Sequence, residues 1–333
     1  MSTLYVTQQD AVLRKTDERL KVTQHGTTLL DVPMIKVSSV VLFGRVTVTA
    51  ATVQALLEHQ IALCYLSQYG RYVGRIEPAL SKNSLLRTAQ YRAAFAPAVT
   101  LALARQMVRG KLSNMRVFLQ RANRGLDDPA LTQAVERLKM QLLAVDATDS
   151  TEQLRGMEGA GSAVYFGVFG SLIKAEGLSF TKRVRRPPTD PVNALLSFGY
   201  ALLAHDIHSA VNTVGFDPYQ GYLHVAHYGR PSLALDLMEE FRPLIVDSVV
   251  LLCLNKRIIG PEDFTVELGN VCRLSEAARK KFLVQYEERK NTEIQHPIFD
   301  YKVTYQRCFE LQARLLAKYL QGEIAEYPPF MTR

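Results

Sequence analysis

Apolar residues in the first 77 positions come in short runs, several of them alternating with polar residues, which is the period of a β-strand. We expect strands at residues 4–6, 20–22, 29–32, 35–37, 40–43, 46–48, 61–66 and 72–76. Thr49 is suited to capping a helix that reaches about residue 60. The pattern therefore predicts a small β-rich domain for scaffolding or dimerisation.

From residue 78 to the end, apolar residues recur at helical spacing. A helix should run through Gly110, another should begin at Pro129, and Ser150 with Gln153 forms a capping-box pair that starts a third. Later helices are expected at 193–213, 231–255, 275–290 and 298–322, with a connector at 256–271 and a flexible tail. The predicted class is α+β: a β-rich domain (1–77), a linker (78–90) and a larger all-α catalytic domain (91–333).

Composition narrows the classes of protein. The chain has 333 residues, a hydrophobic fraction of 47% that is ample for a packed core, and a formal net charge of +8 that favours a polyanionic partner. Its four cysteines form no CxxC pair, so neither a zinc ribbon nor a disulfide framework is predicted. No signal peptide is recognisable, and no apolar run approaches the roughly 18 residues of a membrane span. We expect a cytoplasmic protein without membrane contact.

Positive charge is concentrated early in the helical region. Residues 78–126 contain nine Lys and Arg residues and no acid, whereas an ordinary solvated surface mixes the two signs. Arg105, Arg109 and Arg116 would fall within about 40° of one another on one helix, a stripe suited to phosphates. The alternative is a surface paired with acids elsewhere in the fold. The candidates for DNA contact, including two from the basic loop 181–191, are Arg87, Arg92, Arg105, Arg109, Arg116, Lys182 and Arg183.

Residues 221–243 hold the strongest candidate site. His224 lies between two glycine-containing turns, and Pro231 suits the first turn of a helix that carries Asp236, Glu239 and Glu240. These acids span an arc of roughly 100°, so all three can point the same way. Such acids usually form a solvated face, but apolar neighbours predict that this helix is buried, and buried acids need a partner such as a cation.

Two further segments carry candidate residues. Glu158 lies on the helix that begins near residue 151, among small residues that either leave room for a ligand or permit a close helix crossing. Tyr165, two turns later, and Tyr200 on the next long helix are candidate neighbours of the site. The dipeptide His205-Asp206 is typical of HD-type phosphohydrolases, but His208 is its one obvious companion.

Three segments together resemble a known family, and the resemblance covers nearly the whole chain. They are RGMEGAGSAVYF, DPVNALLSFGYALL and GFDPYQGYLHVAHYGRPSLALDLMEEFRPLIVD, which follow a β-rich N-terminal region. The order of residues in the last segment is particular. The chain resembles the first of the numbered CRISPR-associated proteins, the endonuclease that acts as the integrase of spacer acquisition.

The resemblance implies a site. The family's metal ligands correspond to Glu158, His224 and Glu239, and a further active-site acid corresponds to Asp236. Glutamate stands at 239 where some members have aspartate, and His227 is a second imidazole nearby. Such ligands suit Mn²⁺ or Mg²⁺. The resemblance further implies homodimers, double-stranded DNA from spacer precursor and repeat array, and a small ferredoxin-like partner, the second CRISPR-associated protein.

Two other functions stay open at this point. One is a basic DNA-binding protein without catalytic activity, whose acid cluster is structural. The other is an HD-type metal phosphohydrolase centred on His205 and Asp206.

Overall fold

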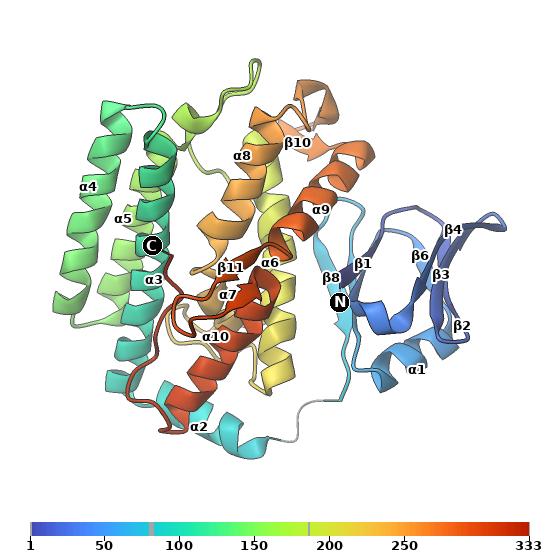
Figure 1. Ribbon diagram of the computed structural model, residues 1–333, viewed down its shortest axis with the longest axis horizontal. Coiled ribbons are helices and arrows are strands. Elements are labelled where there is room, and N and C mark those ends of the chain that lie inside the picture. Colours follow the sequence, from blue (N-terminus) through green and yellow to red (C-terminus); the bar gives the residue numbers. More distant parts are fainter. Residues whose placement is uncertain (1, 80–82, 186, 333) are drawn as a thin grey trace.

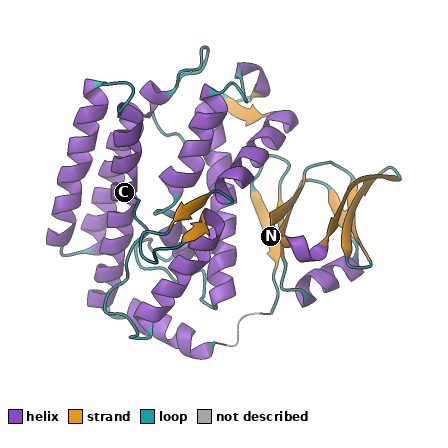
Figure 2. Ribbon diagram, in the orientation of Figure 1, coloured by secondary structure: helices purple, strands orange, loops and turns teal. Residues whose placement is uncertain are grey.

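The computed structural model describes residues 2–79, 83–185 and 187–332. Strands β1 to β8 gather at one end of the molecule, next to a larger region that is mostly helical (Figures 1 and 2). The α+β class, with strands first and a largely helical region after them, is confirmed. No helix within the described ranges combines the length and apolarity that crossing a bilayer requires.

The β-rich part contains two four-stranded sheets. The first has the order β1 (Ser2–Val6), β5 (Val37–Phe43), β7 (Ala62–Leu66), β8 (Tyr72–Ile76), and only the β7–β8 pair is antiparallel. The second has the order β4 (Thr27–Pro33), β3 (Arg19–Gln24), β2 (Ala11–Thr16), β6 (Val46–Val48). Helix α1 (Ala50–Glu58) is capped by Thr49, as predicted. A strand at 35–37 was wrong, because a 3₁₀ turn occupies Met34–Lys36; strand β2 was not predicted.

Strand β5 joins the two parts of the molecule, because both of its faces are buried. Val40 and Leu42 belong to the core of the β-rich part. Val41 and Phe43 point the opposite way, as successive strand residues must, and belong to the core of the helical region. There the Phe43 ring lies 6.0 Å from the ring of Phe198. The first sheet is therefore a layer shared by two cores.

The helical region contains nearly all the helices expected. They are α2 (Ser84–Ala94), α3 (Pro97–Asn123), α4 (Pro129–Ala144), α5 (Thr151–Phe169), α6 (Pro191–Val214), α7 (Ser232–Met238), α8 (Ser248–Asn255), α9 (Glu276–Lys290) and α10 (Tyr305–Leu320). Helices α3, α4 and α5 pack side by side, and α6 packs against α7, α8 and α10 (Figure 1). Helix α2 begins at Ser84, inside the range expected to be a linker. The division into domains stays a prediction.

Two short hairpins interrupt the helical region. Strands β9 (Phe264–Glu267) and β10 (Val271–Leu274) form one, within the range expected to be a connector, and β11 (Glu293–Gln295) and β12 (Lys302–Thr304) form the other. Gly269 and Asn270 have φ angles of +81° and +58°. Residues that tolerate positive φ are those that close tight turns between antiparallel strands, so the turn between β9 and β10 had a signal in the sequence.

The C-terminal tail is packed into the core, contrary to the expectation of flexibility. Tyr327 and Phe330 are almost fully buried. The amide of Asn114 on α3 donates to the carbonyl of Phe330 at 2.7 Å, and the backbone N–H of Phe330 donates to the carboxyl of Glu240 at 2.8 Å. The tail therefore ties α3 to the chain that follows α7.

Candidate active site

The helix that carries the acids is interrupted within the candidate site. Helix α7 ends at Met238, turns follow, and a π-helical segment occupies Pro243–Asp247 before α8 begins. Pro243 has no N–H to donate to the carbonyl of Glu239, and its ring crowds that carbonyl, so a regular helix cannot continue there. A continuous helix over 231–255 was therefore wrong. Single π-helical turns of this kind are frequent at functional sites.

Asp236 organises the loop that presents His224. Its carboxylate is fully buried. One oxygen accepts from the backbone N–H groups of Tyr222 and Leu223 at 2.6 and 3.0 Å; the other accepts from the N–H of His224 at 2.9 Å and lies 2.6 Å from its Nδ1. Gly221 lets the loop approach this closely, because a Cβ there would lie 2.6 Å from Asp236 Oδ2. Asp236 thus fixes both the loop and the imidazole.

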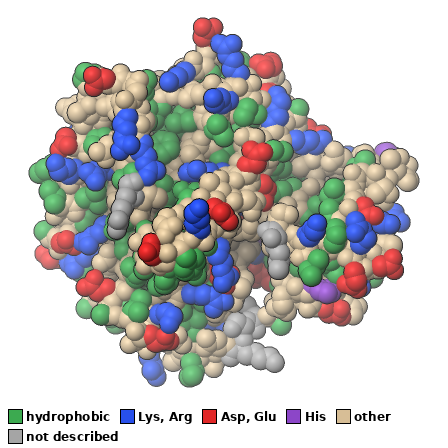
Figure 3. Space-filling view, viewed as in Figure 1, with side chains coloured by type: hydrophobic (Ala, Val, Ile, Leu, Met, Phe, Trp, Pro, Cys, Tyr) green, Lys and Arg blue, Asp and Glu red, His purple; other side chains and the backbone are tan. Residues whose placement is uncertain are grey.

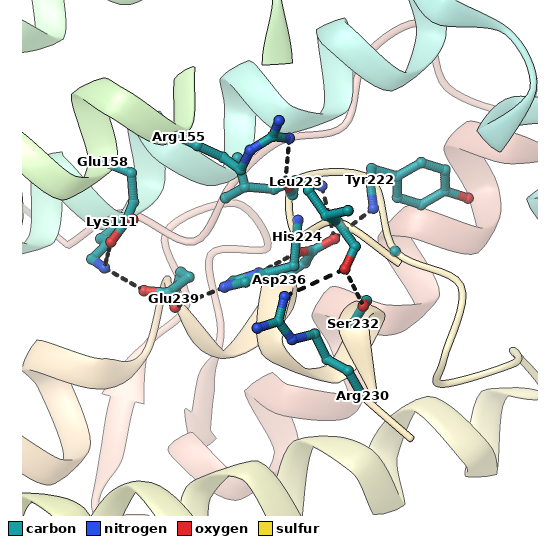
Figure 4. A network of polar contacts seen from close by, with 12 residues as sticks. Lys111, Arg155, Glu158, Tyr222, Leu223, His224, Arg230, Ser232, Asp236 and Glu239 are labelled. Atoms are coloured by element: carbon teal, nitrogen blue, oxygen red, sulfur yellow. Dashed lines mark hydrogen bonds and ion pairs between the residues drawn. The ribbon is translucent and has the colours of Figure 1, made fainter. Parts of the chain in front are cut away.

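The structure brings Glu158, Glu239 and His224 into one network, in which Lys111 bridges the two glutamates and His224 lies beside Glu239, as Figure 4 shows. The Lys111 ammonium, on α3, pairs with Glu158 Oε1 on α5 and lies 2.6 Å from Glu239 Oε2, just beyond α7. His224 Nε2 lies 4.0 Å from Glu239 Oε1. Ser162 Oγ, one turn after Glu158, donates to Glu158 Oε1 at 3.0 Å. Three segments that are distant in sequence therefore meet at the Lys111 ammonium, and the loop that carries His224 adjoins them through Glu239.

Cations hold Glu239 in its charged form. Burial by itself would raise the pKa of Glu239, but Arg242, Lys111 and His224 outweigh burial and lower the pKa to about 2. Burial would likewise lower the pKa of His224, yet the hydrogen bond to Asp236 and the charges of Asp236 and Glu239 together outweigh burial and raise the pKa. Arg242 Nε lies 3.0 Å from Glu239 Oε1, three residues later along the chain. The site is therefore a compact network of compensated charges.

The site is accessible from the side of Glu158 and His224. Their side chains are 22% and 26% exposed, whereas that of Glu239 is 3% exposed. Gly156 and Gly159 are exposed, and within the described part of the chain nothing beyond neighbouring residues of the same helix lies within 4 Å of the place a Cβ would take at either. Gly161, in contrast, lies where α5 crosses α3. The close helix crossing therefore applies at Gly161, and room for a ligand at the other glycines stays a prediction.

We tested whether the three expected ligands suit a divalent ion. As the side chains stand, the described residues contain no group of three or more His, Cys, Asp and Glu that could hold a metal. The ammonium of Lys111 instead contacts both carboxylates. Glu239 Oε2 is buried and has this ion pair but no aligned hydrogen bond within the described part of the chain. Two carboxylates around a cation, an incompletely bonded oxygen and a nearby imidazole nitrogen are a donor set that fits Mn²⁺ or Mg²⁺.

The two candidate tyrosines contact Asp247, a buried acid next to the site, rather than the three expected ligands. Tyr165 and Tyr200 are buried, and their hydroxyls donate to the two oxygens of Asp247 at 2.9 and 2.6 Å. Burial raises the pKa of Asp247 to about 6, against the effect of both tyrosines and Arg242. The Arg242 guanidinium lies 4.5 Å from the centre of the Tyr200 ring. Arg242 therefore lies between the Tyr200 ring and the Glu239 carboxylate, with which it pairs.

Some candidates for DNA contact already bond to other residues of the protein, and others are exposed to solvent. Arg105 donates to the carbonyl of Thr148, Arg109 pairs with Asp146, Arg87 donates to the carbonyl of Gly215, and Arg183 donates to Asn193 and Ser197. Arg116 is half-buried. Arg92 and Lys182 are exposed. The stripe on α3 is thus partly the surface paired within the fold that was the alternative interpretation.

Exposed cations nevertheless lie next to the site. Lys182 and Arg185 line a pocket of about 290 Å³ that extends to Ser162, the hydroxyl donor to Glu158. Figure 3 shows side chains of both signs interspersed over the face it presents, so the net charge is not confined to one patch of that face.

The residues of the HD-type alternative do not form a site. Asp206 is bonded by Lys290 at 3.1 Å and by the Tyr286 hydroxyl at 2.7 Å. Neither ring nitrogen of His205 has a hydrogen-bond partner among the described residues, and burial lowers its pKa to about 3. His208 is directed at Glu77, 3.5 Å away. This dipeptide belongs to the junction between the helical and β-rich parts.

Sequence reasoning missed Lys111 and Arg242 as members of the site. Lys111 was counted only as one charge of the acid-free stretch, although it lies between Val108, Leu112 and Met115 on the buried side of α3. A lysine on an apolar helix face needs a buried anion, and that was a usable signal. Arg242 follows Glu239 at the i, i+3 spacing that favours an ion pair.

A basic helical region that holds two carboxylates, an imidazole and flanking cations in one partly open site has the features of an enzyme that acts on phosphodiesters. Comparison with known proteins identifies the group. The sequence profile of the family described as CRISPR associated protein Cas1 matches residues 4–288. The chain belongs to the Cas1 family.

Individual relatives support this family assignment. The chain is 42% identical over 332 residues to "CRISPR-associated endonuclease Cas1 3" of Thermus thermophilus, covering 99% of this chain and 97% of the relative. It is 40% identical to a "CRISPR-associated exonuclease Cas4/endonuclease Cas1 fusion" of Geobacter sulfurreducens, covering 99% of this chain but 60% of that protein. Among solved structures, a "Cas6-RT-Cas1--Cas2 complex" superimposes with a TM-score of 0.81 at 25% identity, over all of this chain and 36% of that one.

Proposed function

We propose that this protein is a DNA endonuclease and integrase that inserts spacer DNA into a CRISPR array, with its phosphodiester chemistry at Glu158, His224 and Glu239. One observation carries the assignment. Glu158 and Glu239, from separate segments, meet at Lys111 in a partly open site, and His224 Nε2 lies 4.0 Å from Glu239 Oε1. The proposal is further supported by relatives whose names describe CRISPR-associated endonucleases.

We propose that Glu158, His224 and Glu239 hold one Mn²⁺ or Mg²⁺ ion. Such an ion supplies polarisation of a phosphodiester and stabilisation of the charge that develops on its oxygens. His224 is prepared to act as a metal ligand through Nε2. Asp236 accepts a hydrogen bond from the proton on Nδ1, and this leaves Nε2 unprotonated, with its lone pair on the side of Glu239. Arg242 balances part of the charge of Glu239 when a substrate phosphate approaches.

The two activities differ in the nucleophile. In integration, the 3′-hydroxyl oxygen of an incoming DNA end forms a bond to phosphorus and the bond from phosphorus to the displaced oxygen breaks. The proton of the hydroxyl passes to solvent water, and solvent returns a proton to the displaced oxygen. With water as nucleophile, the same exchange at phosphorus cuts DNA. In both, the leaving strand departs with the oxygen that the phosphorus releases.

We propose double-stranded DNA, a second copy of this chain and the small ferredoxin-like second CRISPR-associated protein as partners. The superimposed structure whose name includes Cas1 and Cas2 supports the last of these. Exposed Arg92 and Lys182 are suited to the DNA backbone. The β-rich part is the proposed dimerisation region.

The test compares Glu158→Gln with a matched substitution, Glu136→Gln on the exposed face of α4. Glu136 also pairs with a lysine, Lys139, at 3.3 Å. Glu158→Gln should abolish Mn²⁺-dependent DNA cleavage and strand transfer while the affinity for DNA is retained, and Glu136→Gln should retain both. Cleavage that survives in a folded Glu158→Gln variant overturns the assignment, and DNA binding without any cleavage by the unmodified protein favours a non-catalytic DNA-binding protein.

A further inference from the structure

We infer that Lys111 is a built-in counter-cation, which holds Glu158 and Glu239 together before a divalent ion arrives and which that ion must displace. The inference rests on the proposed metal site at these two carboxylates. It assigns Lys111 as a positioning residue whose ammonium competes with the ion.

The position of Lys111 is the first argument. Its side chain is 3% exposed and reaches from α3 between α5 and the chain beyond α7, so the ammonium is screened from water. It contacts one oxygen of Glu158 and one oxygen of Glu239, which are the two oxygens directed into the space between these segments (Figure 4). A divalent ion that bridges the same carboxylates needs the same place.

The quality of the contacts is the second argument. The ammonium is 2.6 Å from Glu239 Oε2, yet this oxygen has no aligned hydrogen bond within the described residues. Charge attraction, rather than directional bonding, therefore dominates the contact with Glu239. Hydrogen bonds to charged groups are normally the strong ones, so a pairing that lacks this alignment is easier to exchange.

The balance of charge is the third argument. Two neighbouring carboxylates, one of them buried and the other 22% exposed, repel each other and need a cation between them, which Lys111 provides when no metal is present. Arg242 further compensates Glu239 from the opposite side. A divalent ion added to this set would place its charge against that of the ammonium at short range, where screening is weak. Both cations are attracted to the same two oxygens and repel each other, so binding of the ion displaces the ammonium from them.

The consequence is a site that is assembled without metal and binds metal less tightly than the bare carboxylates would. The alternative is that Lys111 has a purely structural role, and it predicts the opposite change in metal affinity. If Lys111 only organised the carboxylates, its removal would loosen them and weaken metal binding.

The test is Lys111→Met, which keeps most of the aliphatic stem and removes the charge. Without metal, its melting temperature should be lower than that of the unmodified protein, because two carboxylates lose their shared cation. Titration calorimetry with Mn²⁺ alone, without DNA, should show tighter binding, with a dissociation constant lower by up to about tenfold. A factor of ten in affinity is a small free energy compared with the cost of breaking a buried ion pair. The rise in melting temperature on adding Mn²⁺ should also be larger.

Two variants serve as controls. Lys139→Met removes a lysine that is paired with Glu136 on the surface of α4, and it should change neither quantity. Lys111→Arg retains the charge and should not bind Mn²⁺ more tightly than the unmodified protein. If Lys111→Met does not fold, Lys111→Gln provides the same comparison with a neutral polar side chain.

The outcomes separate the inference from the proposed function. If Mn²⁺ binding requires Glu158 but is unchanged or weaker in Lys111→Met, the competition by Lys111 is refuted and the metal site stands. If the unmodified protein binds no Mn²⁺, or Glu158→Gln binds it equally well, the proposed metal site is wrong and the role of Lys111 is refuted with it.

Discussion

Asp236→Asn tests how the buried carboxylate prepares His224. The substitution keeps the shape of the side chain and replaces one acceptor oxygen by an NH₂ group. Asp236 now accepts from three backbone N–H groups and faces His224 Nδ1, with two partners on each oxygen. An asparagine can offer an oxygen to only one of these two pairs.

Both orientations of the amide are unfavourable. If its oxygen faces Tyr222 and Leu223, its NH₂ group opposes the N–H of His224 and requires an unprotonated Nδ1, which moves the proton to Nε2, the nitrogen proposed as ligand. If the amide is reversed, the N–H groups of Tyr222 and Leu223 are left unpaired. Each buried donor without an acceptor destabilises by about 1–3 kcal/mol, so we expect a loss of about 3 kcal/mol. That corresponds to a melting temperature lower by about 6 °C.

Calorimetric titration with Mn²⁺ measures the effect on the ligand. Residues that orient a metal ligand typically change affinity about 10–100-fold, so Asp236→Asn should bind Mn²⁺ measurably but more weakly by that factor. Nitrogen chemical shifts of His224, measured by NMR, should report a larger share of the tautomer protonated on Nε2. Nuclease activity should fall strongly.

Glu239→Gln is the matched comparison, because it also removes one buried charge but leaves the loop of residues 221–224 intact. It should abolish Mn²⁺ binding. If Asp236→Asn loses the ion completely while Glu239→Gln retains it, the roles of the two acids are reversed. If Asp236→Asn binds Mn²⁺ as tightly as the unmodified protein, the orientation of His224 does not depend on Asp236 and the reasoning fails.

Two further predictions follow from the charges. Burial raises the pKa of Glu240 from about 4.5 to about 8, so the folded state keeps a proton that the unfolded chain releases, and stability should decrease as pH rises through that interval; Glu240→Gln should flatten this part of the profile of melting temperature against pH. For DNA, Arg92→Gln or Lys182→Gln should each reduce the slope of log affinity against log salt by about 0.9, whereas Arg109→Gln should change it less, because Arg109 already pairs with Asp146; equal slopes for all three would contradict this assignment.

Local patterns were sufficient to predict most elements of the fold. The caps at Thr49 and Ser150 form as expected, because each side chain accepts from the backbone N–H three residues later. The predicted capping box is incomplete, since the side chain of Gln153 accepts from the N–H of Asp149 rather than that of Ser150. The buried strand β5 was found by its apolar run, but its double role was not, since a run that is buried on both faces does not say which layers cover it. The break after α7 was signalled by Pro243 and was overlooked because apolar residues continue on both sides.

The site was predicted in part, and the reason lies in the distance along the chain between its members. His224 and Asp236 are 12 residues apart and their pairing is close to a local motif. Lys111 and Glu158 are 47 residues apart, and their contact depends on how α3 crosses α5. The permissive residue there is Gly161, where a Cβ would collide with Leu112. Helical spacing gives the face on which a residue lies but not the helix that packs against that face.

Glu239 and Glu240 show how packing gives two adjacent acids opposite properties. Both are buried, so desolvation acts on both in the same direction. Glu239 faces cations and stays charged, with a pKa of about 2, whereas Glu240 faces the neutral donors Gln312, Tyr327 and the N–H of Phe330 and has a pKa of about 8.

The expectation that all three acids of this segment point the same way was therefore wrong for Glu240. The turn after Met238 directs Glu240 toward the C-terminal tail and leaves Glu239 directed at Lys111. Asn114, one turn after Lys111 on α3, donates to the carbonyl of Glu240 at 2.7 Å and also to the tail. The same stretch of α3 thus contacts Glu239 through Lys111 and the backbone of Glu240 through Asn114. Because the buried tail also bonds to Asn114 and Glu240, residues about 90 positions later help to fix the backbone that orients the Glu239 carboxylate.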